Sequence, residues 1–308
     1  MSTLNQIADE YLQLRRALGH KMNHAARILP RFIAYLEAIG AETVTVEAAL
    51  TWAQSSPRDP APASRAQRMA VICGFARYLA VIDPRTQIPP PGLLPYPRRR
   101  RIPFIYSLDH IAALMAEARK LRPAFRAATY ETLIGLLGTT GMRVGEAIRL
   151  DAEDFNLAEG VLVVRMSKFG KSREVLLDPS TVAVLAAYAK RRGEIQPCPK
   201  TASFFRSARA TPLLYCDVRS TFCHLVASAG ISATPPMVPH IHDLRHSFAV
   251  RTLVNWYREG KDVQGYLPRL STYLGHCDPH ATYWYLSAAP ELLGQAVGRL
   301  EAIEEGGA

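Results

Sequence analysis

Hydrophobic residues recur at helical spacing through the first quarter of the chain. One stripe runs through residues 24–40 and consists of Ala25, Ile28, Leu29, Phe32, Leu36 and Ile39, which is the spacing of an amphipathic helix. Shorter patterns predict helices over residues 45–56 and 64–82, and we expect Ser64 to be the N-cap of the latter. Together with an amphipathic N-terminus, these patterns predict a small domain of four helices over residues 1–83.

The next stretch has a different composition. Five prolines lie between Pro89 and Pro97, and the run ends in four consecutive arginines, Arg98, Arg99, Arg100 and Arg101. Proline at this density excludes a helix and favours an extended, semi-rigid spacer. Residues 84–106 are therefore predicted to be a linker between two domains.

The hydrophobic period changes once in the second predicted domain, residues 107–308. Most of it predicts helices, over residues 108–121 with Ser107 as N-cap, 129–141, 180–192, 218–230, 242–260 and 289–303. In residues 161–178, β-branched residues lead into a polar turn centred on Gly170 and a second apolar run, which predicts a β-hairpin with Lys168 near its tip. The predicted fold is mainly α with a small β-hairpin, in two domains.

The formal net charge of +10 points to an anionic partner, with nucleic acid the first candidate. Residues 1–101 hold 14 Lys+Arg and 7 Asp+Glu, a net charge of +7. If the partner is nucleic acid, the basic linker is expected to lie as a strap along its phosphate backbone. The alternatives are a basic but otherwise ordinary enzyme and a linker that is basic for solubility. The arginines predicted to contact DNA are Arg65, Arg68, Arg98, Arg99, Arg100 and Arg101, and those within residues 64–82 are expected to face away from the apolar stripe, as is Arg77.

Cysteine usage and hydropathy bear on the compartment. The five cysteines, at positions 73, 198, 216, 223 and 277, include no CxxC pair, which predicts reduced thiols in a cytoplasmic protein. The N-terminus has no apolar core of a secretory signal, and no apolar run has the length of a membrane span. We expect no association with a membrane.

Two groups of histidines raise the question of a metal site. His242 and His246 lie four residues apart, and His276, Cys277 and His280 form a second group. Neither group has the spacing of a zinc finger, and no glutamate follows His242 as the helical zinc-protease motif requires. Glycine-rich nucleotide loops of the known patterns are also absent. We therefore expect no metal and no cofactor.

A different chemistry emerges when the cationic residues are grouped with one tyrosine. The set is Arg143, Lys168, His242, Arg245, His276 and Tyr285. Arginine forks bind the non-bridging oxygens of a phosphate, a lysine can protonate a leaving oxygen, and histidines can donate hydrogen bonds or accept a proton. A tyrosine can attack phosphorus and hold it covalently. Such a set suits phosphoryl transfer, with the arginines supplying the positive charge.

These residues lie in four segments, TTGMRVGEAIRL, SKFGKSREV, HDLRHSFA and LGHCDPHATYWY. Together the segments resemble the motifs of the tyrosine recombinases, the phage integrase family: an arginine, a hairpin lysine, His-x-x-Arg, a histidine after Leu-Gly, and a nucleophilic tyrosine nine residues later. All six positions match, within residues 107–295, and Glu146 matches an acidic position that supports the site in this family. The segment between HSFAV and LGH is slightly long for the family. Residues 1–83 resemble its SAM-like core-binding domain in position and helical character, without a motif.

Three tyrosines compete for the role of nucleophile. The spacing from His276 selects Tyr285, and on a helix Tyr283 points about 200° away from it. Tyr283 and Tyr273 are expected to be core or rim aromatics. His246 is interpreted as a neighbour of the site, and Cys277 and His280 as bystanders.

The resemblance implies a site-specific DNA recombinase. In the implied reaction Tyr285 forms a 3′-phosphotyrosyl link to DNA, and four protomers exchange strands through a Holliday junction. The implied partners are double-stranded DNA with inverted-repeat core sites, further copies of the chain, and other recombinases of the same mobile element. Two alternatives remain: a type IB topoisomerase, which religates the same strand, and a catalytically silent DNA-binding regulator.

Overall fold

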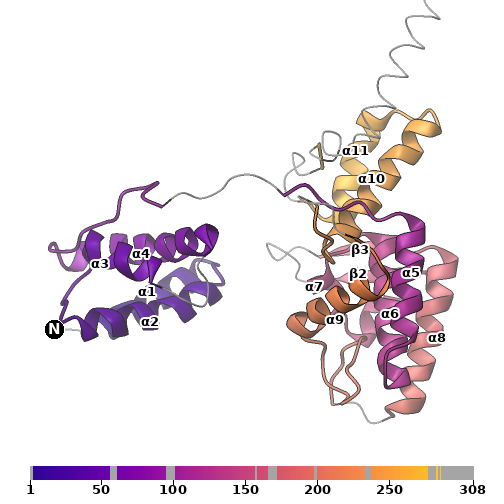
Figure 1. Ribbon diagram of the computed structural model, residues 1–308, viewed down its shortest axis with the longest axis horizontal. Coiled ribbons are helices and arrows are strands. Elements are labelled where there is room, and N and C mark those ends of the chain that lie inside the picture. The colour runs from indigo at the N-terminus through magenta and orange to yellow at the C-terminus, as the bar shows by residue number, and fades with distance from the viewer. Residues whose placement is uncertain are drawn as a thin grey trace, which may run out of the picture. The chain divides into compact units, whose positions relative to one another are not determined.

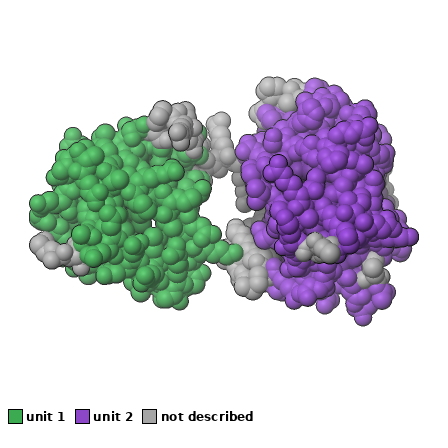
Figure 2. All heavy atoms as spheres, turned by 90° about the horizontal axis from the view of Figure 1, so that it is seen from below, with its two compact units in different colours: residues 1–100 green, residues 101–308 purple. Residues whose placement is uncertain are grey.

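The chain folds into two compact units. In the computed structural model, residues 1–100 form the first unit and residues 101–308 the second (Figure 2). The structure describes residues 3–55, 61–94, 101–156, 158–165, 172–197, 200–232, 237–276, 282, 283 and 285. The division between the units falls inside the predicted linker, residues 84–106.

The first unit contains the four predicted helices: α1 Leu4–Ala17, α2 Asn23–Ala38, α3 Val46–Gln54 and α4 Pro62–Ile82 (Figure 1). The side chains of Thr3 and Thr45 accept hydrogen bonds at the starts of α1 and α3, as good N-caps do. Helix α4 begins earlier than predicted, with Ala61 as N-cap and Pro62 following it. The prediction of Ser64 as N-cap is therefore wrong, because a proline is already set for the first helical position.

The core of the first unit joins the apolar stripe of α2 to α4. Leu29, Phe32 and Leu36 are fully buried, as predicted, and form one cluster with residues of α4 such as Phe75. Ile39, predicted on the same stripe, is 50% exposed because α2 ends one residue before it.

Arg68 lies on the buried face of α4, where the sequence predicts an outward-facing residue. It is only 8% exposed, because it precedes Ile72 by four residues and Phe75 by seven and therefore shares their helix face. The predicted orientation of Arg68 is wrong. Arg65 is partly buried, and Arg77 is exposed as predicted.

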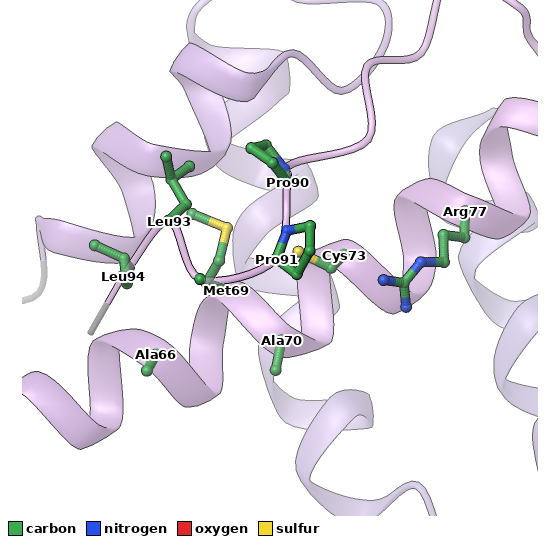
Figure 3. Close-up of a pocket in the computed structure, with 10 residues that line it drawn as sticks. Ala66, Met69, Ala70, Cys73, Arg77, Pro90, Pro91, Leu93 and Leu94 are labelled. Atoms are coloured by element: carbon green, nitrogen blue, oxygen red, sulfur yellow. The ribbon is translucent and has the colours of Figure 1, made fainter. Parts of the chain in front are cut away.

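The first part of the predicted linker packs against the first unit. The thiol of Cys73 lies 3.6 Å from the carbonyl oxygen of Pro89, and Leu93 and Leu94 contact the apolar core. A cavity of about 480 Å³ lies between this segment and α4 (Figure 3). The proline-rich chain as far as residue 94 therefore belongs to the first unit.

The second unit is built mainly from helices around one small sheet (Figure 1). Its elements are α5 Leu108–Arg119, α6 Ala124–Thr140, α7 Val144–Ala147, the 3-10 helix η1 Ala152–Asp154, β1 Phe155–Asn156, β2 Val161–Val164, β3 Arg173–Leu176, α8 Pro179–Ile195, α9 Tyr215–Ser228, α10 Asp243–Arg258 and α11 Val263–Leu274. Ser107 caps α5, as predicted.

The sheet contains the predicted hairpin. Its strand order is β1-β2-β3 and both pairs are antiparallel, with Val161 opposite Leu176 and Val164 opposite Arg173. The predicted turn that carries Lys168 and Gly170 lies outside the described residues.

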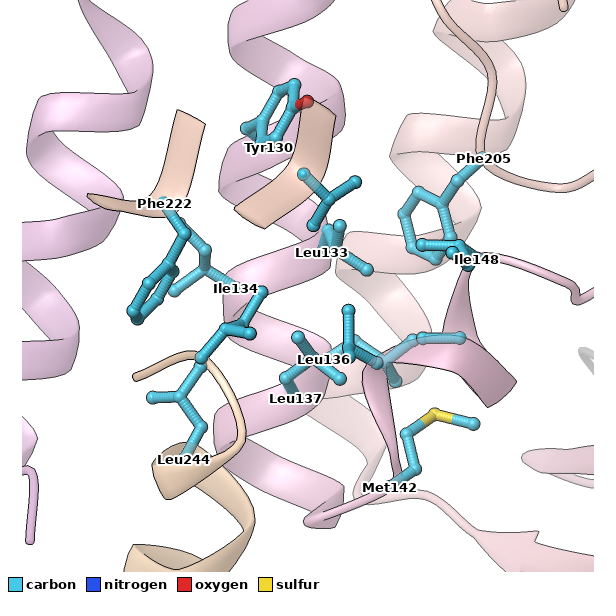
Figure 4. Close-up of a cluster of buried hydrophobic side chains, with 14 of the residues drawn as sticks. Tyr130, Leu133, Ile134, Leu136, Leu137, Met142, Ile148, Phe205, Phe222 and Leu244 are labelled. Atoms are coloured by element: carbon cyan, nitrogen blue, oxygen red, sulfur yellow. The ribbon is translucent and has the colours of Figure 1, made fainter. Parts of the chain in front are cut away.

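Helix α6 forms the centre of the second unit. It is apolar around much of its surface, and Leu133, Ile134, Leu136 and Leu137 are all buried in the main core (Figure 4). A second core joins α10 and α11 and includes Tyr285. The helix predicted over residues 289–303 lies outside the described residues. Among the helices that the structure describes, none combines the length and apolar character needed to cross a membrane.

Candidate active site

Two glycines shape the backbone around the predicted site. Gly141 ends α6 with φ +61°, and a Cβ atom there would collide with the ring of Phe248. Gly275 ends α11 with φ +69°, and a Cβ atom there would lie 2.8 Å from Nη1 of Arg173. Both positions need the left-handed conformation that glycine adopts without strain. Gly275 turns the chain directly before His276, and Gly141 turns it two residues before Arg143.

Arg143 is held between α7 and the end of α11. As the N-cap of α7, its backbone N donates to Oε2 of Glu146 at 2.9 Å, and its Nη1 donates to Oε1 at 2.8 Å. Its Nη2 donates to the Gly275 carbonyl at 3.1 Å. The arginine is thereby fixed by one carboxylate and one carbonyl, with part of its side chain exposed.

Glu146 also binds a second arginine, Arg173 of β3. Nη2 of Arg173 lies 2.9 Å from Oε2 and Nη1 lies 3.2 Å from Oε1, while its Nε donates to the Tyr273 carbonyl at 2.8 Å. Burial raises the pKa of Glu146, but the hydrogen bonds and charge of Arg173, with the bonds from Arg143, outweigh it and lower the pKa to about 2. Glu146 is therefore an ionised bridge between two arginines.

Arg245 is almost fully buried on the first turns of α10. It is 2% exposed, and it donates to the Gly141 carbonyl at 2.9 Å and to the Leu274 carbonyl at 2.8 Å. Burial first, and then the charge of Arg143, lower its pKa to about 10. Carbonyl groups at the ends of α6 and α11 thus hold the guanidinium, which keeps its charge at neutral pH.

Two imidazoles lie beside the ring of Tyr285, and a third lies beside one of them. The ring centroids of His246 and His276 are 5.4 Å and 6.1 Å from that of Tyr285, and His242 is 5.1 Å from His246. Burial first, and then nearby cationic side chains, lower the pKa of all three histidines, and the combined effect brings that of His246 to about 3 and that of His276 to about 4. All three imidazoles are therefore neutral at pH 7.

Tyr285 and Tyr283 lie in different surroundings, as the helical geometry predicts. Tyr285 is 2% exposed and faces the core of α10 and α11, whereas Tyr283 is 49% exposed. Tyr273 packs against the core, its hydroxyl donates to the Leu176 carbonyl at 3.3 Å, and burial raises its pKa to about 12. Of the three tyrosines, Tyr285 has two histidine rings as neighbours.

The structure brings most of the predicted residues together. Arg143, Glu146 and Arg245 are linked through the chain around Gly141 and Gly275, and the charge of Arg143 lowers the pKa of Arg245. His242 precedes α10, and His276 follows Gly275. Lys168 lies outside the described residues.

The arginines predicted to bind DNA are in different surroundings. Arg65 is partly buried and Arg68 is buried, while Arg98, Arg99 and Arg100 lie outside the described residues. Arg101 is paired with Asp243.

Sequence reasoning did not single out Arg173 or Asp243. On a strand, residues two apart share a face, so Arg173 lies on the same side of β3 as the buried Val175. An arginine on an inward face needs a buried partner, and this signal was readable in the sequence. Asp243 directly follows His242 at the start of α10, where a carboxylate is favoured.

A metal centre has no support among the described residues, which contain no group of three or more His, Cys, Asp or Glu side chains able to hold an ion. Cys277 and His280 lie outside the described residues. A cavity of about 350 Å³ is lined by residues that include His276, Thr282 and Tyr283.

The model of the phage integrase family matches residues 106–291. The chain belongs to this family, the tyrosine recombinases. The chain is 43% identical over 310 residues to the integrase/recombinase y4rB of Sinorhizobium fredii, and the match covers 98% of each chain. The tyrosine recombinase XerC of Myxococcus xanthus is 29% identical over 248 residues, covering 77% of this chain and 75% of that protein.

Solved tyrosine recombinases share the fold. The integrase of transposon Tn1549 in complex with transposon right end DNA has a TM-score of 0.63 at 16% identity, covering 96% of this chain and 99% of that chain. A lambda integrase tetramer bound to a Holliday junction has a TM-score of 0.61 at 17% identity, covering 92% and 77%. The predicted fold class is confirmed.

Membership of the tyrosine recombinases also defines the type of reaction. The chain is a tyrosine-type DNA recombinase, an enzyme of a family that cleaves and rejoins DNA strands. The comparisons give no support to the topoisomerase or to the silent regulator.

Proposed function

We propose that this tyrosine recombinase is a site-specific recombinase of a mobile element, with Tyr285 as its nucleophile. The observation that carries the proposal is the convergence of Arg143, Arg245 and His276 on the surroundings of Tyr285. Two fixed guanidinium groups can neutralise the charge that develops on a phosphate during transfer.

The proposed first step is a transesterification. The phenol oxygen of Tyr285 attacks a DNA phosphorus, the bond to the 5′-oxygen breaks, and a 3′-phosphotyrosyl link forms. The phenol proton passes to a neutral imidazole of the histidine group, and Lys168 donates a proton to the leaving 5′-oxygen. Arg143 and Arg245 bind the non-bridging oxygens throughout.

In the proposed second step, the 5′-hydroxyl of another strand attacks the same phosphorus and gives its proton to Lys168. Tyr285 leaves and regains its proton, so the energy of the phosphodiester bond is conserved and no external energy source is needed. Glu146 supports both steps because it accepts hydrogen bonds from the backbone N and from Nη1 of Arg143 and is itself held by Arg173.

Burial of Tyr285 adds a requirement to this mechanism. With 2% of the residue exposed, the phenol oxygen must become accessible when DNA enters the site. We infer that the helical turn carrying Thr282, Tyr283 and Tyr285 shifts on DNA binding.

The partners follow from this function. We propose that the chain binds double-stranded DNA with inverted-repeat core sites, that four copies exchange strands through a Holliday junction, and that other recombinases of the same element take part. The solved relatives on DNA, including the lambda integrase tetramer on a Holliday junction, support this proposal by analogy of fold. We further propose that the reaction takes place in the cytoplasm.

A nicked suicide substrate tests the proposal. A DNA duplex carrying the ends of the element that encodes the chain should trap a covalent protein–DNA adduct with the wild type and not with Tyr285→Phe. Tyr283→Phe is the matched control, because Tyr283 lies two residues away and is exposed, and it should form the adduct normally. Adduct formation by Tyr285→Phe would show that Tyr285 is not the nucleophile.

Two intact sites on one plasmid separate recombination from topoisomerase activity. The recombinase should delete or invert the segment between the sites. Relaxation of the plasmid without exchange between the sites would favour the topoisomerase.

A further inference from the structure

The end of the linker is bonded to the turn that carries His242. Arg101, the last arginine of the linker's basic run, donates through Nη2 to both carboxylate oxygens of Asp243, at 2.5 and 2.6 Å. Its Nη1 donates to the carbonyl of Val238. Asp243 is completely buried and is the first residue of α10, directly after His242. The ion pair therefore joins the linker to the His-x-x-Arg motif.

Asp243 organises the backbone on both sides of His242. Its Oδ2 accepts a hydrogen bond from His240 N at 2.9 Å, and its own backbone N donates to the His240 carbonyl at 3.0 Å. A buried carboxylate is costly unless a cation or several donors satisfy it. Among the described residues, only Arg101 forms an ion pair with Asp243, so the turn depends on this arginine.

A second attachment lies five residues further along the linker. The Tyr106 hydroxyl donates to the His240 carbonyl at 3.3 Å, and Tyr106 N donates to Oγ of Ser247 at 2.7 Å. Ser247 in turn donates to the Asp243 carbonyl at 2.8 Å. Residues 101–106 thus hold the turn before α10 from two points.

The charges of this arrangement act directly on His242. Burial lowers the pKa of its imidazole first; Arg245, Arg143 and Arg101 lower it further, and Asp243 opposes them. His246 adds a neutral ring 5.1 Å away. A change at Arg101 or Asp243 should therefore shift the pKa of His242, and this shift can be measured without DNA.

We propose that Arg101 is a positioning residue which, through Asp243, holds His242 in place for phosphoryl transfer and makes the end of the linker part of the active site. The proposal rests on the function proposed above and assigns Arg101 a role other than the phosphate contact that the sequence predicts. Its guanidinium is already engaged with Asp243 and Val238, which leaves less of it for DNA.

An NMR titration of the free, full-length protein tests the positioning without DNA, with the His242 signal assigned from a His242→Gln variant. Arg101→Ala should raise the pKa of His242, because a cation is lost and Asp243 is no longer neutralised. Asp243→Asn should lower it, and Arg101→Lys should leave it near the wild-type value. Arg119→Ala, which removes another arginine–carboxylate pair of the second unit, is the control and should cause no shift. An unchanged His242 pKa in both Arg101→Ala and Asp243→Asn would overturn the proposal.

The cleavage assay tests the consequence for catalysis. At saturating DNA, Arg101→Ala should form the covalent adduct about 10- to 100-fold more slowly, the effect of misplacing a reacting group by about 1 Å. The DNA concentration for half-maximal rate should change little, and Arg101→Lys should recover part of the rate. Weaker DNA binding with an unchanged rate at saturation would show that Arg101 contacts phosphate and would contradict the proposal. If the wild type itself forms no adduct, the proposed function fails, and the titration still decides whether Arg101 positions His242.

Discussion

A single hydroxyl lies within hydrogen-bonding distance of one ring nitrogen of His276. Nδ1 of His276 lies 2.7 Å from Oγ1 of Thr282, which is 1% exposed. If the hydroxyl donates to Nδ1, the proton of the neutral ring is on Nε2, where it can bind a phosphate oxygen. Thr282 would then orient His276 in the way that outer residues orient metal-binding histidines.

Replacement of Thr282 by valine tests this orientation. Thr282→Val keeps the shape of the side chain and removes the hydroxyl, so adduct formation should slow about 3- to 10-fold, as expected for a hydrogen bond worth about 1 kcal/mol. The rate is measured at saturating DNA. Thr272→Val is the control, because the Thr272 hydroxyl binds a carbonyl of its own helix at 2.9 Å. Equal rates for Thr282→Val and the wild type would show that the hydroxyl does not select the tautomer.

At the level of elements, the ends of α6 and α11 are the main determinants of the site. Gly141 and Gly275 turn the chain where Arg143 and Arg245 receive their carbonyl partners. The helix ends thus fix both guanidinium groups, and a side chain at either glycine would disturb them.

We expect Gly141→Ala to destabilise the protein by at least about 1–2 kcal/mol, the cost of a left-handed residue with a Cβ atom. The contact with the Phe248 ring adds to this cost. The free energy of unfolding is measured in urea. Gly193→Ala is the matched control: Gly193 lies within α8 with open space around it, and alanine there should stabilise by up to about 1 kcal/mol. A Gly141→Ala protein as stable as the wild type would contradict the proposed role of this turn.

The elements were largely predictable, because periodicity reports helices and strands directly. The helices of the first unit and the β2–β3 hairpin follow from their patterns. The burial of Arg68 did not follow, because a charged residue was taken to face outwards although its spacing from Ile72 places it on the core face.

For the candidate site, the sequence predicted the residues but not the contacts between them. Arg143, Arg245, His276 and Tyr285 were predicted from chemistry and from family motifs. Their connections were not, because the pairing of Glu146 with Arg173 and of Arg101 with Asp243 joins segments 27 and 142 residues apart. Contacts at such separations depend on the tertiary packing of β3, α7 and α10, which local patterns do not encode.

The stability of the second unit should decrease at mildly acidic pH. An unfolded histidine has a pKa near 6.5, whereas the folded values are about 4 for His276 and about 3 for His246. The unfolded chain therefore binds more protons between these values, and stability falls as pH falls. Stability should be full above pH 6.5 and decrease progressively towards pH 4. The pKa of Glu146 near 2 acts in the same direction below its ordinary value of 4.5.

Urea unfolding between pH 7.5 and pH 5 measures this dependence. The wild type should lose stability over this range, and His276→Gln, which removes one of the depressed groups, should lose less. A free energy of unfolding that is constant from pH 7.5 to pH 5 would contradict the neutral histidine cluster.

In the proposed reaction, Tyr285 becomes covalently linked to DNA. The most direct test is to trap the adduct on a nicked duplex, digest it with protease and nuclease, and identify the nucleotide-bearing peptide by mass spectrometry. We expect a 3′-phosphonucleotide on Tyr285. A nucleotide on Tyr283, on Tyr273 or on any other residue would contradict it.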